Sequence, residues 1–477
     1  MNKKNNVNNI LIVTAFPTYG AGSGVQVTAL ANSYLNKGKN VTVITGNNKL
    51  DFDKIPGVKY HVVPFKNEEE GEPILGQCDF NYLMFTTHTE STANFWDATL
   101  DQIKEYQGAF RKAINDEVKE SKPDIIHAQH NWITASICTE TGVPVVTTIH
   151  GTDLMGYERS IKELGEIRNK LKTETNPEEI KRLKDEETKY NLYIEHANRS
   201  ALNSKKIIVI SEAQKEKFTE LFPLAANKVE LIENGYDTRK FYVDENVTRE
   251  DVIGKLVSQN TEDGKIPLDY DKLVVFVGKF ADFKGIDILL DAAKNYEEEM
   301  QEQGKKVATV IVGSGQLEEK LKKQAEELKL KNTHFVGRKN TDEVRSIQNL
   351  ADVSLIPSRN EPFGLVVLEG MACGHPVIGT NAGGIPGILN SDKQDISDTS
   401  KTYVTPLGVL VPMDDSEALS DAVCDVLSGK DRFDNKYIVD YTRENYAQEK
   451  VTDHILELFE DVADSQRNNH SKEDEER

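Results

Sequence analysis

The chain has 477 residues, which is too long for one hydrophobic core and predicts two domains of roughly 200 residues each. Its formal net charge of -21 argues against a nucleic-acid partner and disfavours adsorption to anionic membranes. No apolar run approaches the length of a membrane span, the first residues are polar, and the 4 cysteines are scattered. We therefore expect a cytoplasmic protein without an integral membrane segment or signal peptide.

The chain opens with a strand, a glycine-rich loop and a helix. An apolar strand at residues 10–14 is followed by FPTYGAGSGVQVTALANSYLNKGKNVTVIT, which predicts a βαβ unit and hence a parallel sheet. Gly22 and Gly24 let the backbone approach a ligand, and Ser23 can donate to it. The spacing differs from GxGxxG, so a dinucleotide is not inferred. A tight strand-to-helix turn is the structural alternative.

Polar residues follow two further predicted strands. Strands at 125–128 and 145–149 lead directly into HAQHNW and HGTDL. An open α/β sheet places its ligands at such strand ends, so His130, His150, Thr152 and Asp153 become candidates, with structural packing as the alternative. No HxxxH pair accompanies the histidines, and we predict no metal site. The DFD sequence at 51–53 is attributed to chance because it lies in a predicted surface loop.

A charged, helix-prone segment at 157–204 follows HGTDL and predicts an inserted helical hairpin broken near Asn176. It either covers a bound ligand or is a solvent-exposed hairpin with no role in binding. Strands at 207–210 and 229–232 close the first domain. The polar stretch at 238–267 is the predicted hinge.

The second domain begins with the strand at 273–277, whose following loop carries Lys279 and Lys284. Two cations above a helix mouth suit a diphosphate leaving group, although an isolated loop lysine is more often only exposed. Strands at 308–312 and 334–336 follow. The second of these strands ends at Gly337 and Arg338.

The most informative stretch is IPSRNEPFGLVVLEGMACGHPVIGTNAGGIPGI, at 356–388. Gly364 opens a helix, so the amides of Phe363, Gly364 and Leu365 can hold a phosphate. Glu361 and Glu369 flank this helix mouth, and carboxylates bond vicinal hydroxyls well. The pattern indicates a nucleotide sugar. The alternative is a solvated loop glutamate and a polar position on an amphipathic helix.

The sequence EPFGLVVLEGMACGHPVIGTNAGGIPGIL resembles the Glu-x7-Glu signature of retaining glycosyltransferases of family 4. That family has the GT-B fold, an α/β architecture of two facing Rossmann-like domains with a C-terminal helix that crosses back to the first. The resemblance implies an N-terminal acceptor domain at 1–238, a donor domain at 239–440, the returning helix at 441–464 and a disordered tail at 465–477.

The resemblance also implies roles for individual residues. It places His150 at the transferred sugar, with Glu361 and Lys284 as the other catalytic residues. The family has arginine where this chain has Lys279, so the charge is kept but the bidentate fork is lost. The implied donor-binding residues are Gly22, Ser23, Gly24, Lys279, Arg338, Pro362, Phe363, Gly364, Leu365 and Glu369. The acceptor candidates are Tyr19, His130, Thr152 and Asp153.

The function implied is transfer of a hexose from a nucleotide sugar, with UDP favoured, to a hydroxyl acceptor with retention of configuration. No cofactor beyond this co-substrate and no metal is expected. Alternatives are a non-catalytic nucleotide-sugar-binding subunit, an epimerase or a phosphorylase. FPTYGAGSGV and HGTDL are similar to the malate glycosyltransferases of bacillithiol synthesis, which suggests a small anionic acceptor. A lipid-linked or polysaccharide acceptor is the rival, and the oligomeric state stays open.

Overall fold

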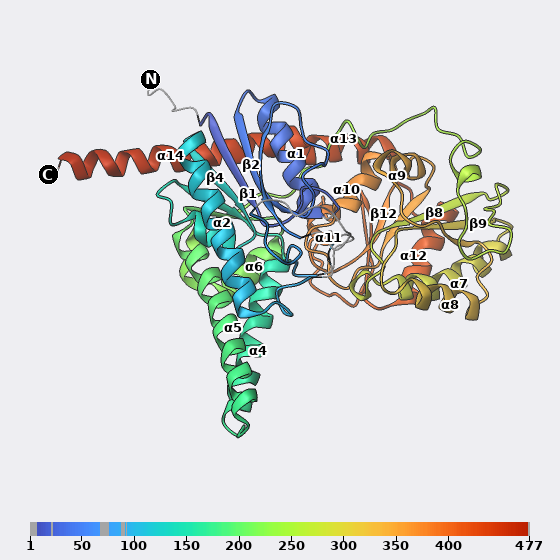
Figure 1. The fold of residues 1–477 in the computed structure, drawn as a ribbon. Helices are drawn as coiled ribbons and strands as arrows, with labels where there is room; N and C mark the ends of the chain where they lie inside the picture. Colours follow the sequence, from blue (N-terminus) through green and yellow to red (C-terminus); the bar gives the residue numbers. More distant parts are fainter. Residues whose placement is uncertain (1–6, 21, 67–75, 87–90, 92, 476–477) are drawn as a thin grey trace. The chain divides into compact units, whose positions relative to one another are not determined.

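The computed structural model describes residues 7–20, 22–66, 76–86, 91 and 93–475, with side chains up to residue 465. The chain divides into two compact units (Figure 1). Unit 1 comprises Met1–Glu233 and Val451–Arg477, and unit 2 comprises Asn234–Lys450. Each unit is built around a seven-stranded, largely parallel sheet with helices, which confirms the predicted α/β class.

Unit 1 contains a parallel sheet with the strand order β3-β2-β1-β4-β5-β6-β7. The strand order runs outward from β1, through β2 and β3 on one side and through β4 to β7 on the other. Polar residues that follow β1, β4 and β5 therefore lie together at the carboxyl ends of the strands. Its elements are β1 (Asn9–Thr14), α1 (Gly22–Asn36), β2 (Asn40–Asn47), β3 (Lys59–Pro64), α2 (Leu100–Ser121), β4 (Ile125–Gln129), α3 (Ile133–Cys138), β5 (Val145–Thr148), α4 (Thr152–Leu171), α5 (Pro177–Asn203), β6 (Lys206–Val209), α6 (Glu212–Leu221), a 3-10 turn (Pro223–Lys228) and β7 (Val229–Leu231).

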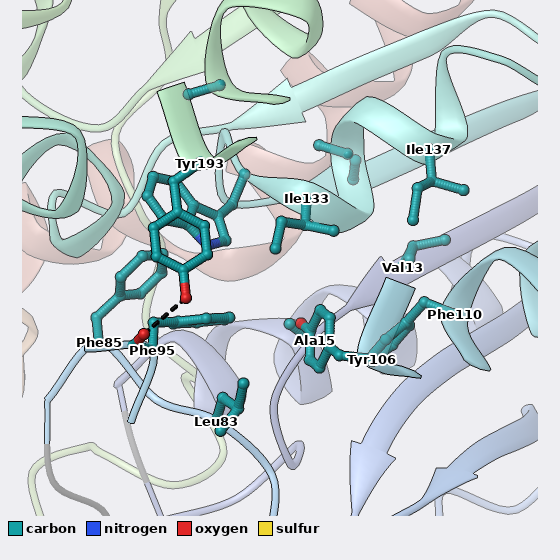
Figure 2. Close-up of a cluster of buried hydrophobic side chains, with 14 of the residues drawn as sticks. Val13, Ala15, Leu83, Phe85, Phe95, Tyr106, Phe110, Ile133, Ile137 and Tyr193 are labelled. Carbon is teal, nitrogen blue, oxygen red and sulfur yellow. Dashed lines mark hydrogen bonds between the residues drawn. The ribbon is translucent and has the colours of Figure 1, made fainter. Parts of the chain in front are cut away.

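Aromatic side chains fill one face of this sheet. Figure 2 shows Phe95, Tyr106 and Phe110 gathered near Val13 of β1 and Ile133 of α3. The Tyr193 hydroxyl donates to the Phe95 carbonyl at 2.6 Å, so a phenol buried in the core keeps its hydrogen bond (Figure 2). These rings attach α2 and α5 to the sheet beneath the loops that carry the candidate histidines.

The predicted hairpin is present as helices α4 and α5, which extend away from the unit 1 sheet (Figure 1). The predicted break is the N-terminus of α5, where the Asn176 side chain accepts from the Glu178 amide and Pro177 takes the first helical position. Lys189 is buried at the base, and its ammonium donates to the Trp96 and Ala98 carbonyls at 2.8 and 2.9 Å. The hairpin is therefore attached to unit 1 by buried polar contacts as well as by its apolar stripe.

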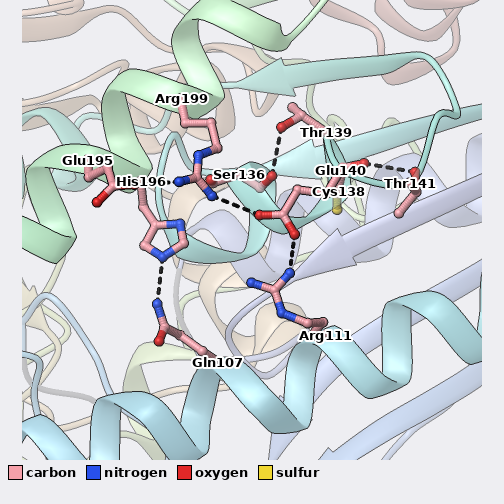
Figure 3. A network of polar contacts seen from close by, with 10 residues as sticks. All are labelled: Gln107, Arg111, Ser136, Cys138, Thr139, Glu140, Thr141, Glu195, His196 and Arg199. Carbon is pink, nitrogen blue, oxygen red and sulfur yellow. Dashed lines mark hydrogen bonds and ion pairs between the residues drawn. The ribbon is translucent and has the colours of Figure 1, made fainter.

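A polar network also holds the base of α5 (Figure 3). Glu140, just after α3, accepts from Arg111 of α2 and from Arg199 of α5, the latter at 2.9 Å. Arg199 also pairs with Glu195 one turn earlier in its own helix. One carboxylate thus joins two helices that the sequence separates widely.

Unit 2 repeats the architecture with the strand order β10-β9-β8-β11-β12-β14-β13, in which only the β13–β14 pair is antiparallel. Its elements are a 3-10 turn (Ile253–Lys255), β8 (Lys272–Val277), a 3-10 turn (Asp282–Lys284), α7 (Ile286–Glu302), β9 (Val307–Val312), α8 (Glu318–Glu327), β10 (Thr333–Phe335), α9 (Thr341–Gln348), β11 (Val353–Ile356), α10 (Leu365–Ala372), β12 (Val377–Thr380), α11 (Ile385–Leu389), β13 (Tyr403–Thr405), β14 (Gly408–Val411), α12 (Ser416–Ser428) and α13 (Asn435–Tyr446).

The C-terminal region differs from the predicted single helix and disordered tail. The chain forms α13 and then α14 (Gln448–Glu475), with Ala447 between them in an extended conformation. Helix α14 continues through the expected tail, because residues 465–475 contain neither proline nor glycine to stop it. From residue 451 the chain belongs to unit 1, where Phe459 packs on Tyr34.

The polar stretch at 238–267, where the sequence predicts the hinge, belongs to unit 2. Its Asn260 side chain donates to the Thr333 carbonyl and accepts from the Phe335 amide, each at 2.9 Å. The segment therefore lies against the free edge of β10. The division between the units falls instead at residues 233/234 and 450/451.

Candidate functional site

Lys284 and Glu361 form an ion pair in unit 2, with Nζ 2.5 Å from Oε2. Lys284 ends the 3-10 turn after β8, and Glu361 lies in the loop between β11 and α10. Their side chains are only 18% and 13% exposed, so the pair is partly desolvated and stronger than a surface ion pair. Two residues that the sequence separates by a whole βαβ unit thus meet at the carboxyl ends of adjacent strands.

Backbone packing holds this pair in place. Gly285 has φ 63°, and a Cβ added there would lie 2.0 Å from the Pro357 carbonyl oxygen. Gly383 has φ 59°, and a Cβ there would lie 2.1 Å from the Glu361 carbonyl oxygen. The next amide, Gly384 N, donates to that oxygen at 2.8 Å. Side chains at these two positions would push the loops apart, which explains the NAGGIP sequence.

Arg359 braces the same loops, a contact that the sequence reading missed. Its guanidinium binds Asp287 at 2.6 and 3.0 Å, Asp414 at 2.5 Å and the Asp282 carbonyl at 2.6 Å. Burial opposes ionisation of Asp287, but the hydrogen bonds and charge of Arg359 outweigh it and hold the pKa of this carboxyl below its ordinary value. The SRNE sequence, one residue after the end of β11, was the available signal.

Helix α10 begins at Leu365, and its N-cap is Gly364 with φ 112°. The first amides of any helix have no intrahelical acceptor, so those of Gly364 and Leu365 are suited to an anion. Glu369 lies one turn into this helix. Burial raises its pKa to about 7, and the positive charge of Lys240 only partly offsets that effect. The carboxyl therefore titrates near neutral pH.

The remaining predicted donor residues of unit 2 lie in neighbouring loops. Lys279 is exposed in the loop after β8, and Arg338 is exposed after β10. Gly337 before it has φ 70°, and its carbonyl accepts from the Gly313 amide at 3.0 Å. Pro362 is half-buried, and the buried Phe363 ring lies 6.4 Å from the ring of Tyr446. The Gly313–Gly337 hydrogen bond joins the loops after β9 and β10, and the parallel pairing of β8, β9, β10 and β11 places the ends of all four strands at one edge of the sheet.

Unit 1 places the first glycine-rich segment at the start of α1. Gly22, Ser23 and Gly24 form its first turn, and a Cβ at Gly24 would lie 2.5 Å from the Pro17 carbonyl oxygen. The Tyr19 hydroxyl donates to the Asn47 side chain at 3.1 Å, at the end of β2. The loop is therefore folded closely over the ends of β1 and β2.

The rings of His150 and His130 lie against each other at the neighbouring strand ends, with centroids 4.5 Å apart and planes inclined by 39°. His130 has φ 70°, an uncommon conformation for a residue other than glycine and one that clusters at functional sites. Burial lowers the pKa of His150 to about 4 and lowers the pKa of His130 as well. Both imidazoles are neutral near pH 7.

Asp153 is buried beneath this pair. Its carboxylate accepts from the Asn131 amide at 2.8 Å and from the His150 and Leu154 amides at 3.3 and 3.2 Å. Burial raises its pKa to about 6, and these amides limit the rise. The carboxylate holds the two histidine loops together. Thr152 next to it is half-buried at the first position of α4.

His127 is buried and has a packing role. Its ring contacts the Tyr34 hydroxyl at 3.1 Å and the Thr148 hydroxyl at 2.7 Å, and it lies against Phe459 of α14. Gln129, which the sequence reading passed over, lies 2.8 Å from His150. His127 and Gln129 project from the same face of β4, and they differ in what packs against them: Tyr34 and Phe459 at His127, and His150 at Gln129.

The described residues contain no group of three or more metal-ligating side chains. Asp51 and Asp53 of the DFD sequence are both exposed between β2 and β3. None of the described helices combines the length and apolar character that a bilayer crossing requires.

Comparison with known proteins finds two family models side by side. "Glycosyltransferase Family 4" matches residues 94–240, and "Glycosyl transferases group 1" matches residues 258–445. A D-inositol 3-phosphate glycosyltransferase of Saccharomonospora viridis is 24% identical over 354 residues, or 71% of this chain and 70% of that protein.

Two solved structures share the fold. Sucrose-phosphate synthase of Thermosynechococcus elongatus has a TM-score of 0.66 at 18% identity, covering 96% of this chain and 100% of that one. Anabaena HepE, in complex with UDP and glucose, has a TM-score of 0.61 at 15% identity, covering 94% and 99%.

One parallel α/β sheet in each unit, together with these matches, identifies the chain as a glycosyltransferase of the GT-B fold. The chain carries both glycosyltransferase domains, which agrees with the family 4 signature in its sequence. It is a sugar-transferring enzyme.

Proposed function

We propose that this enzyme transfers a hexosyl group from a nucleoside diphosphate sugar to a hydroxyl acceptor with retention of configuration. The observation that carries the proposal is the Lys284–Glu361 pair beside the N-terminus of α10. A cation and free helix amides suit a diphosphate, and nearby carboxylates suit sugar hydroxyls. UDP is the favoured nucleotide, supported by the HepE structure, which is a complex with UDP and glucose.

In the proposed mechanism, unit 2 binds the donor. Lys284, Lys279 and the α10 amides stabilise the diphosphate as negative charge develops on it. Glu369 binds the ribose hydroxyls and Glu361 contacts the hexose. His150 of unit 1 contacts the transferred sugar, following the family resemblance. The acceptor attacks on the face that the leaving group vacates, and the departing phosphate accepts the acceptor proton. No metal ion takes part in this scheme.

The acceptor in this proposal is a small hydroxyl compound. The similarity to malate glycosyltransferases favours a negatively charged one. The named substrate of the relative from Saccharomonospora viridis, inositol 3-phosphate, combines a polyol with an anion. We also propose that the enzyme acts in the cytoplasm, since all four cysteines are buried and free.

A thermal-shift panel of UDP-, GDP- and ADP-sugars tests the donor, with slow donor hydrolysis followed in the same samples. One nucleotide class is expected to raise the melting temperature of the wild type and to have a weaker effect on Glu369→Ala. Stabilisation by a nucleotide sugar without hydrolysis or transfer would favour a non-catalytic binding subunit. Release of an epimer without acceptor would favour an epimerase, and no response to any nucleotide sugar would overturn the proposal.

A further inference from the structure

Gln129 and His150 are neighbours at the carboxyl ends of two adjacent strands. Gln129 ends β4, where it is in register with Thr148 of β5, and His150 follows two residues later. His150 Nε2 lies 2.8 Å from Gln129 Oε1. Gln129 is fully buried and His150 is 8% exposed, so this hydrogen bond is shielded from water.

The hydrogen bond specifies which ring nitrogen carries the proton. An amide oxygen can only accept, so Nε2 of His150 is the donor. The ring is neutral near pH 7, because burial lowers its pKa to about 4. Nδ1 therefore carries a lone pair. No described residue forms a hydrogen bond with that nitrogen.

The surroundings of the ring keep it uncharged. The titratable groups near it are His130, whose ring centroid lies 4.5 Å away; Asp153, which accepts from the His150 amide; and the buried His127. His130 is itself neutral, and its Nδ1 and the Gln129 amide nitrogen are buried without a partner among the described residues. Buried polar atoms left unpaired are costly, and they recur where a protein keeps a site for a ligand.

We propose that Gln129 is a positioning residue, which holds His150 as the neutral Nε2–H tautomer so that Nδ1 accepts a hydrogen bond from a hydroxyl of the transferred sugar. The inference rests on the proposed glycosyl transfer and adds to it a reason why the site prefers a hydroxyl group to an anionic group at this position. A ring nitrogen lone pair attracts a hydroxyl proton and repels a carboxylate or phosphate oxygen. This side chain therefore selects the uncharged, hydroxyl-bearing part of the substrate.

The test uses the full chain and two substitutions of Gln129. In Gln129→Leu the acceptor is gone, so the tautomer is no longer fixed. Hydrolysis of UDP-glucose is expected to fall about tenfold, the effect of losing one hydrogen bond to a substrate, while the thermal shift by UDP persists. Nitrogen-15 NMR of labelled histidines, assigned with His150→Ala, reads the tautomer directly. A leucine variant that keeps the Nε2–H signal would overturn the inference.

Gln129→Glu keeps an acceptor but adds a charge beside Nε2. The carboxylate raises the pKa of His150, so the ring becomes an imidazolium at lower pH and Nδ1 can no longer accept. Hydrolysis by this variant is expected to fall as pH decreases below about 7 and to recover above it. A pH profile parallel to that of the wild type would contradict the proposal.

Thr148→Val is the matched control, because it removes the hydroxyl that contacts His127 on the same strand pair. It is expected to lower the melting temperature without changing the pH profile or the His150 signals. Failure of wild type to bind or hydrolyse any UDP-, GDP- or ADP-sugar would instead overturn the proposed function. Donor hydrolysis with an unchanged tautomer in the leucine variant would overturn this inference alone.

Monodeoxy analogues of the donor sugar identify the hydroxyl. With the wild type, one analogue is expected to react about tenfold more slowly than the parent sugar. With His150→Ala, the same analogue and the parent sugar should react at equal rates. The reason is that removing the hydroxyl and removing the imidazole are not additive when the two groups are in contact. Additive losses for every analogue would exclude a hydrogen bond from a sugar hydroxyl to His150.

Discussion

Lys284 Nζ lies 2.5 Å from Glu361 Oε2 and joins the loop after β8 to the loop after β11 in unit 2. The two residues are 77 positions apart in the sequence, so the fold brings them into contact. The pair places a cation and a carboxylate together before any ligand binds. Such preorganised charges stabilise a charged transition state without reorganisation at the moment of reaction.

Replacement of Lys284 by alanine is expected to lower donor hydrolysis and transfer by about 100-fold, because the cation that stabilises the departing diphosphate is lost. Steady-state rates with the donor identified by the thermal-shift panel measure this. Lys294→Ala, which removes an exposed ion pair with Glu298 on α7, is the control and should leave the rate unchanged. Equal rates for both variants would exclude the catalytic role of Lys284.

Glu369 is expected to make the free energy of unfolding depend on pH. Its folded-state pKa of about 7 lies above its ordinary value of 4.5, so the folded chain retains a proton that the unfolded chain has released. The stabilisation is complete below pH 4.5 and is lost as pH rises through 7, by at most about 3 kcal/mol.

Urea unfolding of wild type and Glu369→Gln at about pH 5 and about pH 8 measures this loss as a difference between the two proteins. The glutamine variant should show the smaller decrease in unfolding free energy across the range. Glu327→Gln, at an exposed site on α8, is the control. Identical decreases in wild type and the Glu369 variant would show that this carboxyl does not titrate in the window.

Replacement of Arg359 by lysine is expected to destabilise unit 2 by about 1–3 kcal/mol, because an ammonium cannot bind Asp287 in the bidentate way while also reaching Asp414. Chemical unfolding measures the change. Arg182→Lys is a matched control, since Arg182 makes a similar two-nitrogen contact with Glu179 on the exposed surface of α5. That substitution should cost less than about 0.5 kcal/mol; a comparable cost at both sites would contradict the bracing role.

Lys189→Met tests how the α4–α5 hairpin is attached. The change removes the ammonium that donates to the Trp96 and Ala98 carbonyls and pairs with Glu186. It leaves two carbonyls unpaired, and we expect a loss of about 2–4 kcal/mol. Urea unfolding measures this loss of stability, and limited proteolysis reports whether the hairpin detaches. Lys184→Met, exposed on the same helix, should have little effect, and an equally stable Lys189 variant would show that apolar packing alone holds the hairpin.

Removal of divalent ions is expected to leave donor hydrolysis and transfer unchanged, because Lys279, Lys284 and the α10 amides supply the positive charge that a metal would otherwise provide. Rates in excess EDTA, compared with rates after adding back Mg²⁺ or Mn²⁺, measure this. If EDTA abolished activity and either ion restored it, a bound metal ion would be the group that stabilises the diphosphate.

The class of fold, the existence of the hairpin and the regions that carry the candidate site could all be predicted from the amino-acid sequence. Those features depend on local signals: apolar strands, helix-breaking Asn176–Pro177, and polar residues directly after a strand. The glycosyltransferase class followed from one long motif. Local signals also misplaced the end of the C-terminal helix, where charged residues were taken for disorder although nothing in them stops a helix.

Which of these residues are in contact depends on the three-dimensional fold. It paired Lys284 with Glu361 and brought Arg359 to Asp287 of α7 and to Asp414 of the loop after β14. It also placed Gln129 against His150, while His127 packs against Tyr34. The physical reason is that parallel strands adjacent in a sheet are distant in sequence. The register and alternation of β4 and β5 determine which side chains meet, and no local pattern encodes that register.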